Sequence, residues 1–223
     1  MMDDRQSFMD RRDAGRVLAS RLRSYAGRTD VVVLALPRGG VPVGYEVASA
    51  LDAPLDVFLV RKLGTPGHRE LAMGAIASGD VRVLNDDVVR WYGIPESAIE
   101  QVAREEAAEL ERREREYRHG KPALDLANRI VILVDDGLAT GSTMRAAAQA
   151  VRMHRPSRVV VAVPVGAPQT CSEIAAVADE VICARMPEPF SAVGQWYGDF
   201  EQTGDDEVRD LLQKSAATPE AYR

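Results

Sequence analysis

The sequence is poor in cysteine, in positive charge and in aromatic residues, which make up 5% of the chain. Only Cys171 and Cys183 are present. Because no histidine lies near them at ligand spacing, we expect small buried residues rather than a metal pair. Lys and Arg number 28 against 34 Asp and Glu, and the resulting net charge of −6 argues against a nucleic-acid partner. Any anion-binding site must therefore be local.

The chain also lacks an apolar run of membrane-spanning length and a charged-then-apolar opening segment. We therefore expect a soluble, cytoplasmic protein with no membrane partner. Its 223 residues suffice for one sizeable core, which favours a single domain over residues 1–223. The core is expected at about 30–185, with accessory segments at 1–27 and 186–223.

Short apolar segments alternate with helical patterns along most of the chain. The patterns predict strands at 31–36, 55–60, 130–134, 159–165 and 181–184, and helices at 10–26, 42–51, 143–154 and 169–178. This alternation predicts an α/β fold with a mostly parallel sheet and right-handed crossovers.

Two segments interrupt the alternation. In 73–84, apolar runs flank Gly79 and Asp80, a strong hairpin signal that predicts a protruding β-arm. Residues 95–118 predict a long charged helix, with Ser97 and Glu100 as a capping box. Its charges suit a solvated helix face better than a partner surface.

The most informative stretch is RIVILVDDGLATGST at residues 129–143. A β-branched run ends in Asp135 and Asp136, and ligands bind at the carboxyl ends of strands in open α/β sheets. Gly137, Ala139, Gly141 and Ser142 are small enough for the backbone to wrap an anion at a helix N-terminus. The expected binding segment comprises Gly137, Leu138, Ala139, Thr140, Gly141, Ser142 and Thr143. Two carboxylates beside a phosphate make sense if they bind sugar hydroxyls or hold Mg²⁺ through water.

This stretch resembles the signature of the type I phosphoribosyltransferases, in which a hydrophobic strand leads into two acids and a T-G-x-T or T-G-x-S turn. The resemblance runs from about residue 30 to 200 and implies the fold of that family. It is closest to the uncharacterised bacterial phosphoribosyltransferase-domain proteins. Strand-end acids also occur in response-regulator-like and Walker B contexts, which is the competing interpretation.

A second glycine-rich turn follows the first predicted strand. Arg38 offers a planar fork of donors, and Gly39 and Gly40 allow an anion-binding backbone. Two phosphate-binding turns indicate a ligand phosphorylated at two places, such as phosphoribosyl pyrophosphate. By resemblance, Arg38 to Gly40 take the pyrophosphate and residues 140–143 the 5-phosphate. The alternative is a plain tight turn with a surface arginine.

Arg61 and Lys62 are expected at the carboxyl end of the second strand, where two cations would help to neutralise pyrophosphate. Beyond them, a Gly- and Pro-containing stretch carries His68 and Glu70, where family members place a flexible catalytic loop. Either residue is a candidate for moving a proton of the acceptor, although a solvated polar loop explains both equally well.

Aromatic residues gather near the end of the chain, at Phe190, Trp196 and Tyr197. They are candidates for a hood that stacks on a planar acceptor, or they pin the chain end onto the core. The N-terminal segment, 1–27, is the other candidate for the hood. Ala139 stands where the hypoxanthine and guanine enzymes carry an acid, which disfavours a 6-oxopurine acceptor.

The resemblance implies a Mg²⁺-dependent phosphoribosyltransferase that acts on phosphoribosyl pyrophosphate and a small-molecule acceptor, with a homodimer left open. Asp135 and Asp136 would hold the ribose hydroxyls, and would hold the metal by way of the ribose or of water. Two rivals remain. One is a regulatory protein that senses the same ligand, and the other is a phosphatase-like hydrolase with Asp135 as nucleophile.

Overall fold

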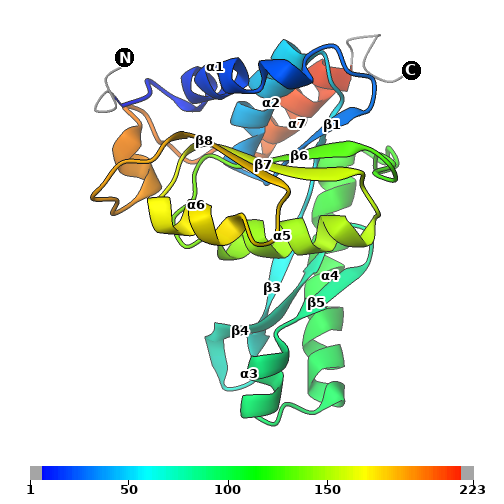
Figure 1. Cartoon of the computed structure of the whole chain (residues 1–223). Coiled ribbons are helices and arrows are strands. Elements are labelled where there is room, and N and C mark those ends of the chain that lie inside the picture. Colours follow the sequence, from blue (N-terminus) through cyan, green and yellow to red (C-terminus); the bar gives the residue numbers. More distant parts are fainter. Residues whose placement is uncertain (1–6, 217–223) are drawn as a thin grey trace.

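Five parallel strands form the central sheet, in the order β2-β1-β6-β7-β8 (Figure 1). A computed structural model describes residues 7–216 of the chain. The strands are β1 (Val31–Ala35), β2 (Leu55–Val57), β6 (Ile130–Val134), β7 (Arg158–Val165) and β8 (Glu180–Arg185). The predicted α/β fold with a parallel sheet is confirmed. β1 and β6 are direct neighbours, so the segments that follow them emerge side by side.

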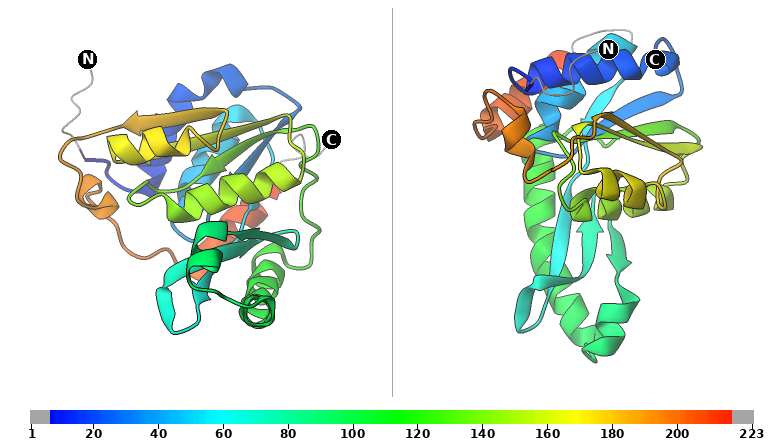
Figure 2. Two further views of the ribbon diagram at one scale, coloured as in Figure 1. Left: turned by 60° about the horizontal axis from the view of Figure 1, so that its bottom comes forward. Right: turned by 60° about the vertical axis from the view of Figure 1, so that its left-hand side comes forward.

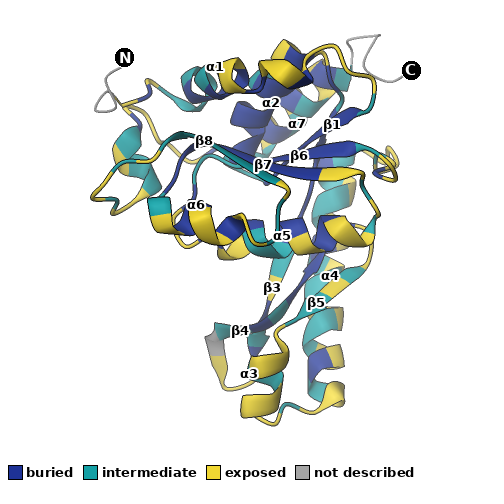
Figure 3. Ribbon diagram, viewed as in Figure 1, coloured by how far each residue is buried: buried dark blue, intermediate teal, exposed yellow. Residues whose placement is uncertain are grey.

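Alternate residues of these strands face two different cores, which is why the strands are apolar throughout. In β6, Ile132 and Val134 join one core, whereas Val131 and Leu133 join the other. All five residues of β6 are buried, as Figure 3 shows in dark blue.

Helices cover both faces of the sheet (Figures 1 and 2). The first core is covered by α1 (Arg11–Arg21), α2 (Gly40–Leu51) and α7 (Asp205–Ala216), and the second by α5 (Ser142–Met153) and α6 (Pro168–Ile174). Short 3₁₀ turns occur as η1 (Arg23–Tyr25) and η2 (Val193–Trp196). The sequence patterns missed α7.

A second, antiparallel sheet projects from the central one as an arm (Figure 2). It contains β3 (Val60–Thr65), β4 (His68–Ala77) and β5 (Val81–Leu84). The predicted hairpin is confirmed, since Ala77 pairs with Val81 across a turn in which Gly79 and Asp80 both have positive φ. The short helix α3 (Asp86–Trp91), not predicted, and the long helix α4 (Glu96–Arg118) complete the arm.

The structure corrects three expectations in this region. Residues 55–60 are not one strand, because the chain leaves the central sheet after Val57 and enters the arm at Val60. The stretch after Leu63, where a flexible loop was expected, is an antiparallel hairpin with Pro66 and Gly67 at its tip. The predicted capping box on α4 does not form, since the N-cap is Pro95 and makes no side-chain hydrogen bond.

Within residues 7–216, no helix combines the length and the apolar character needed to cross a membrane.

Candidate functional site

Asp135 and Asp136 follow β6 directly, and the turn at Arg38 to Gly40 follows β1. A Cβ atom on Gly40 would lie 2.8 Å from the carbonyl oxygen of Val134 and 3.0 Å from Cα of Asp135. Such distances are too short for any residue but glycine. Two backbones can approach this closely because β1 and β6 pair in parallel register and end together. The two acids and the glycine-rich turn therefore form one site.

The carboxylates of this pair differ in their surroundings. Oδ1 of Asp135 accepts a hydrogen bond from the backbone N–H of Asp136 at 2.8 Å. Burial, and then the charge of Asp136, raise the pKa of Asp135 well above its usual range. Burial also raises the pKa of Asp136, but a hydrogen bond and the charge of Arg11 act against that shift. Asp136 is thus the better-stabilised anion of the two.

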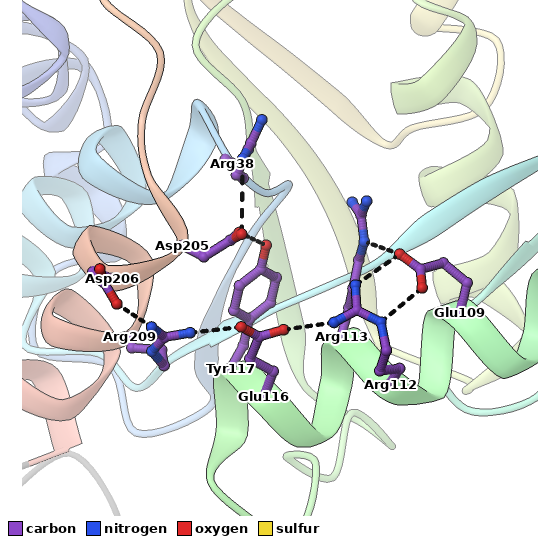
Figure 4. A network of polar contacts seen from close by, with 9 residues as sticks. All are labelled: Arg38, Glu109, Arg112, Arg113, Glu116, Tyr117, Asp205, Asp206 and Arg209. Atoms are coloured by element: carbon purple, nitrogen blue, oxygen red, sulfur yellow. Dashed lines mark hydrogen bonds and ion pairs between the residues drawn. The ribbon is translucent and has the colours of Figure 1, made fainter.

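The cis peptide bond between Pro37 and Arg38 opens the glycine-rich turn. Within the turn, the N–H of Gly40 donates to the carbonyl of Leu36 at 3.0 Å and so closes the turn on itself. Arg38 Nη1 lies 3.8 Å from Asp205 Oδ2, at the start of α7. The same carboxylate accepts a hydrogen bond from the hydroxyl of Tyr117 at 2.5 Å, as Figure 4 shows. The turn is thereby linked to α4 and α7.

Residues 137–143 run from β6 into α5, as expected from the signature. Leu138 is buried and pairs with Gly166 in an isolated bridge, which pins the loop onto the end of β7. Gly141 has a φ of +68° and caps α5 without a side-chain bond. Thr140 and Ser142 are exposed, with their hydroxyl oxygens 3.3 Å apart. The positive end of the α5 dipole and these hydroxyls can together hold an anionic group.

Sequence reasoning missed Thr170, which supports this loop from α6. Its hydroxyl donates to the carbonyl of Ala139 at 2.7 Å, and its methyl group would be 2.6 Å from a Cβ atom on Gly141. A lone threonine on a separate helix gives no sequence signal, because only the fold brings it to the loop.

Arg61 and Lys62 lie within β3, so the structure corrects their expected place at the end of a central strand. Arg61 donates from Nε to Glu106 Oε2 of α4 at 2.7 Å. Lys62 is exposed. His68 begins β4 and its ring lies 5.7 Å from that of Tyr92. The side chain of Glu70 lies outside the described part of the structure.

The aromatic tail packs against the N-terminal segment, so both candidate hood segments meet. Phe8 and Tyr197 form a parallel bridge, and their rings are 5.5 Å apart. The hydroxyl of Tyr197 donates to the carbonyl oxygen of Asp136 at 2.5 Å, which brings the tail to the acids. Phe190 and Trp196 pack on the same small cluster. The tail therefore pins the chain end and also reaches the site.

Arg11, at the first position of α1, is a second residue that sequence reasoning missed. Its Nε donates to Asp136 Oδ2 at 2.9 Å, although 125 residues separate the two. One signal was present: an arginine at a helix N-terminus opposes the helix dipole, so its position needs a tertiary explanation.

Two carboxylates with hard oxygen donors suit Mg²⁺, which commonly takes few ligands from the protein and the rest from water and substrate. Among the described side chains, no group of three or more His, Cys, Asp or Glu could hold a metal ion. Asp135 and Asp136 fit a magnesium ion shared with a ligand.

The two cysteines were expected to be small buried residues. Cys171 is buried and Cys183 is half-buried.

The profile of the phosphoribosyl transferase domain matches residues 9–195. Two Mycobacterium tuberculosis proteins, both named as candidate phosphoribosyl transferases, are 51% identical over 208 residues, which cover 93% of this chain and 47% of theirs. The chain thus spans about half the length of these curated relatives. The bifunctional protein PyrR of Clostridium novyi is 27% identical over 154 residues, covering 69% of this chain and 67% of its own. A solved structure from Thermus thermophilus has a TM-score of 0.84 at 42% identity, covering 94% of this chain and 99% of that one.

Proposed function

Because the chain belongs to the phosphoribosyl transferase family, we propose that it transfers ribose 5-phosphate from phosphoribosyl pyrophosphate to a small-molecule acceptor. The bond between C1 of the ribose and the pyrophosphate oxygen breaks, a bond from C1 to the acceptor forms, and pyrophosphate leaves. One observation carries the proposal: the turn at Arg38 to Gly40 lies against Asp135 and Asp136. These two acids directly precede the loop at 137–143. A ligand with a sugar between two phosphate groups matches that order of parts.

Each part of the site has a role in this reaction. Asp136, the better-stabilised anion, accepts hydrogen bonds from ribose hydroxyls. The hydroxyls of Thr140 and Ser142 and the N-terminus of α5 bind the 5-phosphate. Arg38 binds the pyrophosphate and stabilises its charge as it leaves, because a guanidinium matches phosphate oxygens. Asp135 and Asp136 would hold Mg²⁺ by way of water or ligand oxygens, and the ion would supply positive charge that stabilises the leaving group.

The aromatic tail and the start of the chain are the hood in this proposal. Phe8 and Tyr197 hold the two segments together, and the hydroxyl of Tyr197 joins them to Asp136. A cover of this kind excludes water, and water competes with the acceptor for a reactive C1. The acceptor is a nucleobase or a small amine.

A binding-only role is the second candidate, and one observation favours it. Both arginines proposed for the pyrophosphate already pair with carboxylates, Arg38 with Asp205 at 3.8 Å and Arg61 with Glu106. A sensor would exchange these pairs for the ligand without chemistry. Replacing His68 or Glu70 by alanine separates the two roles, because a catalyst loses turnover whereas a sensor keeps its affinity.

The test is to incubate the protein with phosphoribosyl pyrophosphate, Mg²⁺ and a panel of nucleobases and small amines, and to measure pyrophosphate release. Release that depends on one acceptor and falls in Asp136→Asn supports transfer. Binding that is weakened in Asp136→Asn, without release for any acceptor, supports the sensor. If the protein does not bind phosphoribosyl pyrophosphate, both candidates fail.

A further inference from the structure

The guanidinium of Arg11 is fixed on three sides. Nε donates to Asp136 Oδ2 at 2.9 Å, and Nη1 donates to the carbonyl of Glu201 at 2.6 Å. The carbon of the guanidinium lies 4.0 Å from the centre of the Phe200 ring, within cation–π range. Only 11% of the side chain is exposed. A side chain held this way cannot sample other rotamers without breaking several contacts.

These contacts determine which oxygen of Asp136 a ligand can use. Arg11 takes one acceptor position of Oδ2, which favours Oδ1 as the oxygen that receives a sugar hydroxyl. Gly39 lies against the same Oδ2, and a Cβ atom on this glycine would be 3.3 Å from Nε of Arg11. The backbone of Asp136 is held separately, since Tyr197 donates to its carbonyl at 2.5 Å. The carboxylate is therefore held in one orientation, and Arg11 supplies the positive charge in this set of contacts.

We propose that Arg11 is a positioning residue for the sugar-binding carboxylate of Asp136, an inference that rests on the proposed function. It acts through Asp136 and not by binding phosphate itself. Its second role is to tie α1 to the tail at Phe200 and Glu201, so that the orientation of the carboxylate depends on the hood being assembled. Removing Arg11 should therefore harm recognition of the sugar while sparing recognition of the pyrophosphate.

The experiment measures binding of ribose 5-phosphate and, separately, of inorganic pyrophosphate by titration calorimetry on the full chain. Arg11→Gln should weaken ribose 5-phosphate about tenfold, as expected for losing a hydrogen bond to a charged group, and change pyrophosphate binding less than about twofold. Arg11→Lys, which keeps the charge but not the fork, should fall between Arg11→Gln and the wild type.

Arg12→Gln is the matched control. Arg12 is the next residue of the same helix, but it faces Glu46 at 3.6 Å and the ring of Tyr45. The Arg12→Gln variant should bind both ligands with the affinity of the wild type. The double variant Arg11→Gln/Asp136→Asn should bind ribose 5-phosphate no more weakly than Asp136→Asn alone, because Arg11 has no carboxylate left to position.

Three results would overturn the inference: unchanged ribose 5-phosphate affinity in Arg11→Gln, equal loss for both ligands, or additive losses in the double variant. Equal loss would mean that Arg11 supports the whole site or contacts the anion directly. If the wild type binds neither ligand, the proposed function fails and the inference falls with it. If the wild type binds both ligands and Arg11→Gln binds them with the same affinity, the inference fails while the proposed function stands.

Discussion

Gly39 lies so close to Asp136 that a Cβ atom on the glycine would stand 2.7 Å from Cγ of the carboxylate. Gly39→Ala should therefore push the Asp136 side chain away from its hydrogen bond with Arg11. Overpacking of this kind costs about 2 kcal/mol of folding free energy, and we expect ribose 5-phosphate binding to fall at least about tenfold. Urea unfolding and titration calorimetry measure the two effects.

Gly204→Ala is the control for this substitution, because a Cβ atom on Gly204 would have no other atom within 4 Å among the described residues. It should leave the affinity for ribose 5-phosphate within error of the wild type. Wild-type affinity in Gly39→Ala would show that the carboxylate position is not needed for binding.

The hydrogen bond from Thr170 to the carbonyl of Ala139 leads to a second prediction. Thr170→Val keeps the shape of the side chain but removes the donor, and leaves a carbonyl of the loop at 137–143 without its partner. Ribose 5-phosphate should bind about fivefold more weakly, which corresponds to about 1 kcal/mol. Thr170→Ser retains the hydroxyl and should recover most of the affinity. Equal binding by all three proteins would contradict a role for α6 in shaping the loop.

Tyr117 gives the protein a pH dependence in the alkaline range. Burial, then the hydrogen bond to Asp205, raise the pKa of its phenol from 10.0 to about 12. A raised folded-state pKa means that the native state holds this proton more tightly than the unfolded state does. The stabilisation is complete below pH 10 and is lost as the pH rises towards 12.

Ultraviolet titration of the phenols and unfolding at a series of pH values test this. Tyr117→Phe should remove one late-titrating phenol and make the loss of stability above pH 10 less steep. Asp205→Asn removes the anionic partner but not the burial, so the pKa should fall only part of the way back. If stability falls equally steeply above pH 10 in Tyr117→Phe and in the wild type, other residues cause that loss.

A buried ion pair joins the long helix α4 to the edge strand β2. Arg118 donates from Nε to Asp56 Oδ1 at 3.0 Å and from Nη2 to the carbonyl of Val57 at 3.0 Å. The two charged side chains are 11% and 9% exposed, so Arg118→Gln leaves a nearly buried carboxylate unpaired and should cost about 3 kcal/mol. Urea unfolding provides the measurement.

Arg112→Gln removes an arginine from the exposed part of the same helix, where it pairs with Glu109 and Glu116 (Figure 4). Its unfolding midpoint should match the wild type, because water screens exposed pairs. Equal loss in the two variants would show that Arg118 acts through helix charge and not through its buried partner.

The sequence predicted the parts of the site that are contiguous along the chain. Asp135, Asp136 and the loop that follows them are adjacent in sequence, and β-branched residues set the strand before them. Arg11 and Thr170 reach these segments from separate helices, and no local pattern identifies the partners that they contact. The strand at 55–60 was predicted as one piece because its apolar residues continue through Phe58 and Leu59, both buried. Periodicity shows burial but not the sheet that a strand joins.

The contact between Arg11 and the tail makes the site depend on two segments that are far apart in the sequence. Arg11 and Glu201 are 190 residues apart, so this contact closes a very long loop of the chain. Both strands that carry the acids and the glycine-rich turn leave the ribosome well before Phe200 exists. The site is therefore complete only once Phe200 and Glu201 have been synthesised and have reached α1.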